Sequence, residues 1–443
     1  MDIEEIPKPP GCMPVLGHVV PLVRGPLEFL RALPEYGDLV RLRLGRMDAI
    51  VACTPDLNQS LLVDDRTFDK GGAIWDRGRE VVGNGLGSCP HADHRSQRRL
   101  IQPAFTDARV KEYSSTVADL VPSLVEGWGT GDRIDVLGQS TLLMMKAVFR
   151  AIFSDSIPDA ELAQAIDDIA SVVQGVYLRA VIPGMDKLPL PMNRRHRAAH
   201  DRLRSTLRSL IARRGSAPAG IRDLMSELMA AGRRPSPHGE LDLREVEDQV
   251  VTFVLAAIDT TSVTVTWALH LLATRPELQQ EIYQEIRSTA AGAPQVDDLA
   301  GLNLTRYAVK ETLRMYPPGW LFSRVTTSTA TLGGYRIPPG VTVVCSPYVV
   351  HHRADIYSAP EEFNPHRWNP EKHQQPPRNA FIAFGHGARK CIGDVFGMNV
   401  AMLILANALA RWRFEPSTNY KVGHKLGFVL TPVGVELSTK PRT

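Results

Sequence analysis

The pattern of hydrophobic and polar positions predicts two strands near the start of the chain. Leu39–Leu44 largely alternates between apolar and polar residues, and Ala49–Cys53 is apolar throughout. Alternation of this kind is typical of a half-buried strand, so we expect strands within residues 38 to 55. A short helix is predicted to begin at Pro55 and to end near Val63.

The segment from Asp69 to Pro90 is rich in glycine and shows little periodicity. Long irregular segments in a compact domain are often binding loops, so we predict either a binding loop or an ordinary surface loop. Its large apolar side chains are Ile74 and Trp75.

Helical periodicity dominates residues 113 to 275, with breaks rich in glycine or proline at Gly127–Gly131, Pro158, Pro183–Pro191 and Pro218–Pro237. The last helix runs from about Leu243 to Ala273 and is apolar nearly all round, which predicts burial. Asp259 and Thr260 interrupt its centre. Burying a carboxylate without a partner is costly. The pair is therefore either structural, with Thr260 bonded to the carbonyl four residues earlier, or functional.

The second half of the chain contains two further helical patterns and two β regions. A helix is predicted over Arg306–Met315, and the apolar run Trp320–Phe322 precedes strands near Thr331–Val344. A long apolar helix follows from about Asp394 to Trp412, and Leu426–Thr431 reads as a terminal hairpin.

Composition and charge fit an ordinary globular protein. Hydrophobic residues make up 44 % and charged residues 22 % of the 443 residues. No linker or fixed repeat divides the chain, so we predict one domain over residues 1–443. The net charge of +3 is too small to indicate nucleic acid as a partner.

Cysteine usage and the N-terminal sequence indicate a soluble cytoplasmic protein. Five cysteines occur without framework spacing, at positions Cys12, Cys53, Cys89, Cys345 and Cys391. A sparse, odd set favours a reducing compartment. The start MDIEEIPKPP lacks the basic and apolar regions of a signal peptide. No run of about 18 apolar residues is evident, so no membrane anchor is expected.

The most distinctive stretch is Phe384–Gly393, with the sequence FGHGARKCIG. Cys391 lies in a loop entering a helix, where the helix dipole and free backbone N–H groups favour the thiolate. Gly387 and Gly393 allow a flat ligand to approach closely, and Arg389 can pair with an acid on that ligand. A lone cysteine near a helix is usually structural. Here six residues at fixed spacing favour a functional site.

This stretch resembles the haem-binding loop of the cytochrome P450 monooxygenases. The resemblance covers nearly the whole chain. It implies a mainly α-helical triangular-prism fold with a minor β region, and a haem b (iron protoporphyrin IX) with Cys391 as axial thiolate. The haem is expected between the helix containing Asp259 and the helix after Cys391. The implied reaction is hydroxylation of a C–H bond, using O2 and two electrons.

The resemblance also assigns residues to the haem and to the structure beneath it. His94 and Arg98, four residues apart on one helix, are expected to hold one propionate, and Arg324 the other. Further cofactor contacts are expected at Ala256, Phe384, Arg389 and Gly393. Glu311, Arg314 and Arg367 are expected to form a buried structural cluster below the haem.

Asp259 and Thr260 match the family's oxygen-activating motif. In that motif the threonine hydrogen-bonds to dioxygen and the acid relays protons. The chain departs from the pattern at Ala257, where the family usually has glycine. We expect its methyl group to narrow the groove for oxygen.

The candidate substrate contacts are mostly apolar. They comprise Ile74, Trp75, Tyr177, Phe253, Ala256, Trp320, Leu321, Phe322 and Phe428. Apolar lining suits a hydrocarbon-like ligand. The segments 53–57 and 63–72 most resemble bacterial terpenoid oxygenases, including those acting on the sesquiterpene pentalenene. A polyketide or macrolide, or a fatty acid, would suit the same lining.

Electrons are expected from a separate ferredoxin and its NAD(P)H-dependent reductase, because the chain has no flavin or iron–sulfur domain and no CxxC motif. A monomer is expected. Arg95, Arg99 and Lys390 are either part of a basic docking face or ordinary solvated charges.

Two alternative functions are compatible with the same fold. One is a haem-thiolate isomerase or peroxygenase, which the Asp259–Thr260 pair disfavours. The other is a haem sensor without turnover.

Overall fold

The computed structural model describes residues 1–45, 47–131, 133–154, 158–181, 188–215, 223–231, 243–417 and 421–442. These residues form two compact units. Unit 1 comprises Met1–Asp76 and Glu311–Cys391, and unit 2 comprises Arg77–Lys310 and Ile392–Thr443. Each unit therefore combines two segments that are far apart in the sequence.

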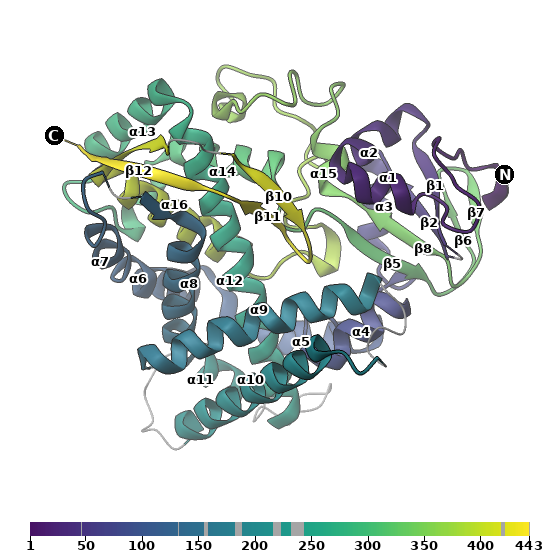
Figure 1. The fold of residues 1–443 in the computed structure, drawn as a ribbon, viewed down its shortest axis with the longest axis horizontal. Helices are drawn as coiled ribbons and strands as arrows, with labels where there is room; N and C mark the ends of the chain where they lie inside the picture. The colour runs from purple at the N-terminus through teal and green to yellow at the C-terminus, as the bar shows by residue number, and fades with distance from the viewer. Residues whose placement is uncertain are drawn as a thin grey trace. The chain divides into compact units, whose positions relative to one another are not determined.

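Unit 1 is organised around a sheet with the strand order β1-β2-β8-β5-β3. Its strands are β1 (Leu39–Leu44), β2 (Met47–Ala52), β8 (Thr342–Cys345), β5 (Phe322–Thr326) and β3 (Phe68–Asp69). The β2–β8 pair is parallel and the other pairs are antiparallel. In Figure 1 the purple strands β1 and β2 lie beside the green strands β8 and β5. The strands predicted within residues 38 to 55 are confirmed.

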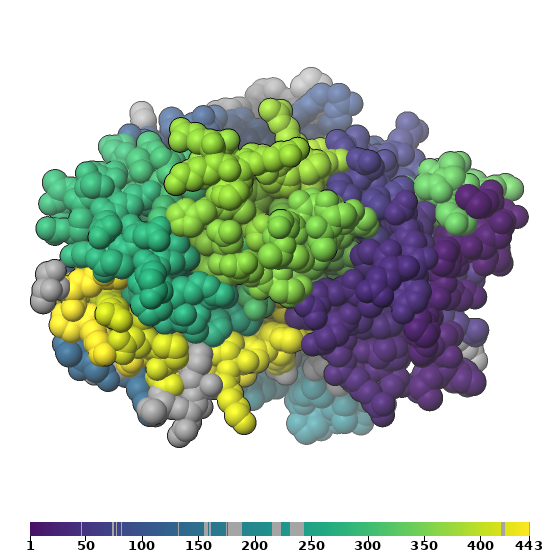
Figure 2. All heavy atoms as spheres, turned by 90° about the horizontal axis from the view of Figure 1, so that it is seen from above, coloured from purple at the N-terminus to yellow at the C-terminus, as the bar shows by residue number. Residues whose placement is uncertain are grey.

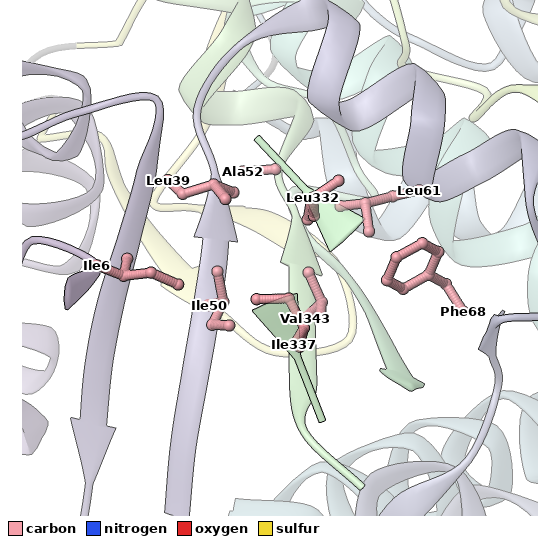
Figure 3. Packing of buried hydrophobic residues seen from close by; sticks show 9 residues of the cluster. All are labelled: Ile6, Leu39, Ile50, Ala52, Leu61, Phe68, Leu332, Ile337 and Val343. Atoms are coloured by element: carbon pink, nitrogen blue, oxygen red, sulfur yellow. The ribbon is translucent and has the colours of Figure 1, made fainter. Parts of the chain in front are cut away.

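The core of unit 1 lies against this sheet. Figure 3 shows its buried side chains: Ile6, Leu39, Ile50, Ala52, Leu61, Phe68, Leu332, Ile337 and Val343. Helix α3 (Pro55–Val63) has the predicted bounds and contributes Leu61. Thr54 caps it by accepting a hydrogen bond from the Leu57 backbone N–H at 3.4 Å, and Pro55 suits the first turn.

Short elements complete unit 1. The helical ones are η1 (Ile3–Glu5), α1 (Val19–Arg24), α2 (Pro26–Ala32), η2 (Leu33–Glu35), α15 (Pro347–His351), η6 (Pro365–Trp368) and η7 (Gly387–Arg389). Strands β6 (Ala330–Leu332) and β7 (Tyr335–Ile337) pair as a hairpin. Figure 2 shows the purple N-terminal segment beside the light green second segment of the unit. An ion pair between Arg31 and Glu361, at 2.7 Å, joins the two segments.

The prediction that residues 69 to 90 are irregular was wrong for half of the segment. Helix α4 spans Gly72–Val82, and residues 70–71 and 83–90 lack regular structure. Tertiary contacts stabilise its start in place of a periodic pattern. Trp75 Nε1 donates to the Ser323 carbonyl at 3.0 Å, and the Lys70 ammonium lies 4.8 Å from the centre of the Trp75 ring.

Unit 2 is mainly helical. Its helices are α5 (His91–Ile101), η3 (Gln102–Phe105), α6 (Asp107–Ala118), α7 (Val121–Glu126), α8 (Val136–Phe153), α9 (Asp159–Val181), α10 (Pro191–Gly215), α11 (Leu224–Ala231), α12 (Leu243–Ala273), α13 (Pro276–Thr289), η5 (Val296–Ala300) and α16 (Asp394–Arg411). Helix α14 (Asn303–Met315) runs from unit 2 into unit 1. The predicted bounds of α12 and α16 agree with the structure to within one residue.

Helix α12 is central to unit 2, because it packs against α8, α10, α13 and α16. In Figure 1, α9 and α10 run side by side near it. Two small sheets accompany the helices: β10 (Gly423–Leu426) pairs with β11 (Leu430–Val433), and β12 (Glu436–Pro441) lies between β4 (Arg133–Asp135) and β9 (Trp412–Pro416). The predicted fold class, mainly α with a minor β region, is confirmed.

Within the part of the chain that the structure describes, three helices are long and apolar enough to cross a membrane, which corrects the expectation that no stretch is apolar enough. They are α8, α12 and α16. In the structure 61 %, 67 % and 56 % of their most apolar windows is buried. Many of their apolar residues are therefore buried in the interior of the protein.

Candidate functional site

The loop before α16 presents Cys391 on its surface. The Cys391 backbone N–H donates to the Phe384 carbonyl at 2.9 Å and closes the loop. Gly385 and Gly387 have φ values of +71° and +69°, which favour glycine. At Gly387 a Cβ atom would lie 2.4 Å from the carbonyl oxygen of Leu62, so only glycine fits there. The thiol is exposed three residues before α16 begins.

The other four cysteines are poorer candidates for a ligand. Burial raises the pKa of the Cys53 and Cys345 thiols to about 12, so neither is a thiolate near neutral pH. Cys89 is buried as well. Cys12 is exposed, but it does not precede a long helix as Cys391 does.

Arg389, predicted to pair with an acid on the ligand, already contacts two carboxylates of the protein. Its Nε lies 2.9 Å from Oδ2 of Asp65, and its Nη2 lies 3.0 Å from Oδ1 of Asp69. Only 2 % of the Arg389 side chain is exposed. The sequence did not indicate these two acids as partners, because they are more than 300 residues away from Arg389.

The surroundings of Arg324 on β5 differ from those of Arg389. It is 5 % exposed, and its Nη1 donates to the Ser323 carbonyl at 2.8 Å. Among the described residues it forms no ion pair. Burial lowers the pKa of Arg324 to about 10. A buried guanidinium without a carboxylate is costly, so this position suits an acid supplied by a ligand.

In unit 2, His94 and Gln97 share the buried face of α5. Gln97 donates to the Asn84 carbonyl at 2.7 Å and accepts from Gln249 on α12 at 3.0 Å. These bonds fix the helix that carries His94. Arg98 lies on the half-buried side and donates from Nε to Gln102 at 2.7 Å.

Helix α12 is exposed at Ala256, although Val254, Ile258 and Thr261 around it are buried. Thr260 donates from Oγ1 to the Ala256 carbonyl at 2.7 Å, which is the bond of the structural alternative. No basic side chain among the described residues pairs with the Asp259 carboxyl. Burial raises the pKa of the Asp259 carboxyl to about 6. Asp259 can therefore gain or lose a proton near neutral pH.

Glu311, Arg314 and Arg367 lie together in unit 1. Arg314 binds Glu311 through two hydrogen bonds, from Nε at 3.0 Å and from Nη2 at 2.9 Å. Arg367 Nε donates to the same carboxylate at 2.8 Å, and Trp368 Nε1 donates at 2.9 Å. The side chains of Glu311 and Arg314 are 0 % exposed.

Comparison with known families decides the identity of the fold. A family model described as Cytochrome P450 matches residues 7–439. The chain belongs to the cytochrome P450 family. It is a P450 monooxygenase, and members of this family carry a haem-thiolate cofactor.

Three similar proteins of known name come from Streptomyces. Cyclooctat-9-en-7-ol 5-monooxygenase of Streptomyces melanosporofaciens is 39 % identical, over 92 % of this chain and 89 % of that protein. Pentalenene oxygenase of Streptomyces avermitilis is also 39 % identical, over 93 % and 92 %. Cyclooctatin synthase of Streptomyces melanosporofaciens is 38 % identical, over 98 % and 95 %.

The residues of this P450 fit a haem. Cys391 offers an exposed sulfur, and Arg324 offers a buried cation that lacks a carboxylate. In unit 2 the first turns of α16, including Val395 at 46 % exposure, are less buried than Val400 to Leu409. Exposed apolar surface on α16 and at Ala256 suits a flat, mostly apolar ligand.

The predicted substrate contacts of this P450 differ in accessibility. Phe428, at the tip of the β10–β11 hairpin, is 51 % exposed, and Leu321, Phe322 and Trp75 are half-buried. Trp320 is 7 % exposed. Phe253 is 9 % exposed and packs on Phe105 with ring centres 5.4 Å apart. The side chains of Ile74 and Tyr177 lie outside the described residues.

Proposed function

We propose that this P450 hydroxylates a terpene-like hydrophobic molecule, using O2 and a haem b whose axial ligand is Cys391. The observation that carries the proposal is the exposed Cys391 in a glycine-shaped loop before α16, while Cys53 and Cys345 are buried with raised pKa values. When bound, the haem supplies the activation of dioxygen.

In this proposal, each side chain that the family resemblance assigns to the haem holds a different part of the cofactor. Arg324 neutralises one propionate, and His94 and Arg98 bind the other. Phe384, Gly393 and Ala256 line the macrocycle. Together the two units form one haem-thiolate domain over residues 1–443, as the match over residues 7–439 supports.

On α12, Asp259 relays protons and Thr260 hydrogen-bonds to oxygen. The raised pKa of Asp259, about 6, lets it exchange protons with water near neutral pH. The Thr260 hydroxyl donates to the Ala256 carbonyl in the structure and can rotate to donate to oxygen. The methyl group of Ala257 narrows the same groove.

The names of three relatives support a terpene-like substrate, because they include a pentalenene oxygenase and two proteins named for cyclooctatin chemistry. The apolar candidates Phe322 and Phe428 are at least partly exposed and can contact such a ligand. Polyketides, macrolides and fatty acids remain alternative substrates for the test.

A separate ferredoxin and its NAD(P)H-dependent reductase supply the electrons in this proposal. P450 monooxygenases in general need such redox partners. We propose a cytoplasmic monomer, in line with the bacterial relatives.

A turnover assay tests the proposal. Purified protein is incubated with ferredoxin, reductase and NAD(P)H, using panels of terpenes, macrolides and fatty acids. Hydroxylated terpene that depends on all three components supports it. Product formed equally well with peroxide alone indicates a peroxygenase, rearranged product without NAD(P)H indicates an isomerase, and haem binding without any product indicates a sensor.

A further inference from the structure

His351, the last residue of α15, is a fully buried histidine without a role in the proposed haem and substrate contacts. Its Nδ1 lies 3.1 Å from the Arg314 carbonyl oxygen, and its Nε2 accepts a hydrogen bond from the Ile382 backbone N–H at 3.0 Å. Buried polar atoms need partners, and here both ring nitrogens have one. The imidazole therefore bridges helix α14 and the segment that precedes the Cys391 loop.

The two hydrogen bonds fix the protonation state of the His351 ring. A carbonyl oxygen can only accept, so Nδ1 carries the proton, and an amide N–H can only donate, so Nε2 is unprotonated. Burial, and then the nearby Arg314 guanidinium, lower the pKa of His351 well below its usual range. The ring is therefore neutral and acts as a bridge that donates at one end and accepts at the other.

The end of the bridge at Arg314 is firmly held. Arg314 Nη1 donates to the His351 carbonyl at 2.8 Å, so these two residues are joined by two hydrogen bonds. Arg314 also binds Glu311 through two hydrogen bonds, and both side chains are 0 % exposed. Moving Arg314 would separate a buried ion pair, which is costly.

The other end of the bridge leads to the Cys391 loop. Residues 381–386 form no helix or strand, so few backbone bonds hold them. The Gly385 N–H donates to the Ile382 carbonyl at 2.9 Å, and the Cys391 N–H donates to the Phe384 carbonyl at 2.9 Å. With the bond from the Ile382 N–H to the imidazole, three hydrogen bonds connect the ring to the backbone of Cys391.

The face of the His351 ring contacts the same segment. It stacks on the Phe381 ring, with centres 5.3 Å apart and an interplanar angle of 8°. The Phe381 ring contacts the Trp368 ring edge-on at 5.2 Å, and Trp368 donates to Glu311. Stacking and hydrogen bonding therefore both connect the buried Glu311 cluster with the start of the loop. A phenylalanine at position 351 can keep the stacking but not the hydrogen bonds, so the two contributions can be separated.

We propose that His351 is a positioning residue for Cys391, which links the fixed backbone of Arg314 to the segment that enters the Cys391 loop. The hydrogen bond from the Ile382 N–H is the decisive one, because it lies on the loop side of the bridge. The inference rests on the proposed haem site at Cys391, since the position of the loop is measured through ligation of the iron.

The test measures, in the ferrous carbon monoxide complex, the ratio of protein with the red-shifted Soret band of thiolate ligation to protein without it. His351→Phe leaves the Ile382 N–H and the Arg314 carbonyl without their partner. We expect the ratio to fall by about tenfold, as for one buried hydrogen-bonding group left unpaired. His352→Phe is the matched control and should keep the wild-type ratio, because the His352 ring bonds to the Tyr348 carbonyl at 2.8 Å and not to the loop.

Two amide variants separate positioning from a general effect on stability. The amide oxygen of His351→Gln can take the place of Nε2 and accept from the Ile382 N–H, so we expect most of the wild-type ratio to return. The shorter amide of His351→Asn takes the place of Nδ1 and bonds only to the Arg314 carbonyl, so its ratio should be as low as in His351→Phe. Melting temperatures are measured in parallel. A residue with a purely structural role would lower them without changing the ratio in the folded protein.

Three results would overturn this inference while the proposed function survives. The first is a wild-type ratio in His351→Phe. The second is an equal ratio in His351→Gln and His351→Asn, because the bond to the Ile382 N–H would then make no difference. The third is a failure of all three His351 variants to give soluble haem protein, because His351 would then support the whole fold. Wild-type protein without the red-shifted band contradicts the proposed function instead.

Discussion

Arg367 Nε lies 2.8 Å from Oε1 of Glu311, although the two residues are 56 positions apart. The same carboxylate accepts hydrogen bonds from Arg314, Trp368 and the Asn364 backbone. Because Glu311 and Arg314 are fully buried, every bond to this carboxylate compensates for lost hydration.

Removing the carboxylate should therefore destabilise the protein strongly. We expect Glu311→Ala to lower the free energy of unfolding by about 3–5 kcal/mol, because the buried Arg314 loses its counter-ion. Thermal melting and the yield of soluble haem protein measure this. Glu361→Ala is the control, since it removes the exposed pair with Arg31 and should cost less than about 1 kcal/mol. Similar melting temperatures for the two variants would show that the cluster contributes little.

The raised pKa of Asp259 predicts a pH-dependent stability. Its carboxyl has a pKa of about 6 in the folded protein against an ordinary value of 3.8. As pH rises from 3.8 to 6, the unfolded chain loses this proton first, so the folded protein loses stability, in total by about 3 kcal/mol. Well above pH 6 this loss of folding stability is complete. The side chain of Asp259→Asn cannot ionise, so this variant should not lose stability in this way.

The advantage of Asp259→Asn over wild type should grow with pH, with roughly half of it developing between pH 5 and pH 8. Melting temperatures at both pH values provide the measurement. Asp297→Asn, which changes a side chain that is 80 % exposed, should show no such trend. An advantage of Asp259→Asn that is equal at both pH values would mean that Asp259 ionises at its ordinary pKa.

Thr260 should control the coupling of electron use to product. We expect Thr260→Ala to keep haem and substrate binding but to consume NAD(P)H with release of peroxide. Proton-transfer groups are typically worth about 10²–10⁴-fold, so the loss of product should be easy to detect. The measurement is product formed per NAD(P)H consumed. Thr264→Ala is the control, because Thr264 makes the same kind of bond, to the Thr260 carbonyl at 2.8 Å, and is buried. If Thr260→Ala formed as much product per NAD(P)H as the wild type, the proposed role of this hydroxyl would be wrong.

Local patterns predicted the elements that have strong local signals. Helix α3 begins at Pro55 after a capping Thr54, and α12 and α16 are long apolar runs, so their bounds could be read from the chain. Helix α4 could not, because Gly72 and Gly78 weaken its pattern and its start depends on the distant Ser323.

Site residues could be predicted where they belong to a short motif with fixed spacing. They could not be predicted where their partners are distant in the sequence. The Cys391 loop and the Glu311–Arg314 pair are short motifs, and both were found from the sequence. Asp65 and Asp69 were missed, because only folding brings them to Arg389 across more than 300 residues. The difference in charge compensation between Arg389 and Arg324 likewise appears only when burial and partners are known.

The central claim is that Cys391 is the axial thiolate, and the ferrous carbon monoxide spectrum tests it most directly. The wild-type protein and Cys12→Ala, which changes the other exposed cysteine, should both show the red-shifted Soret band of thiolate ligation. Cys391→Ala should lack that band and all product formation. Retention of the red-shifted band in Cys391→Ala would contradict the account, because another residue would then supply the sulfur.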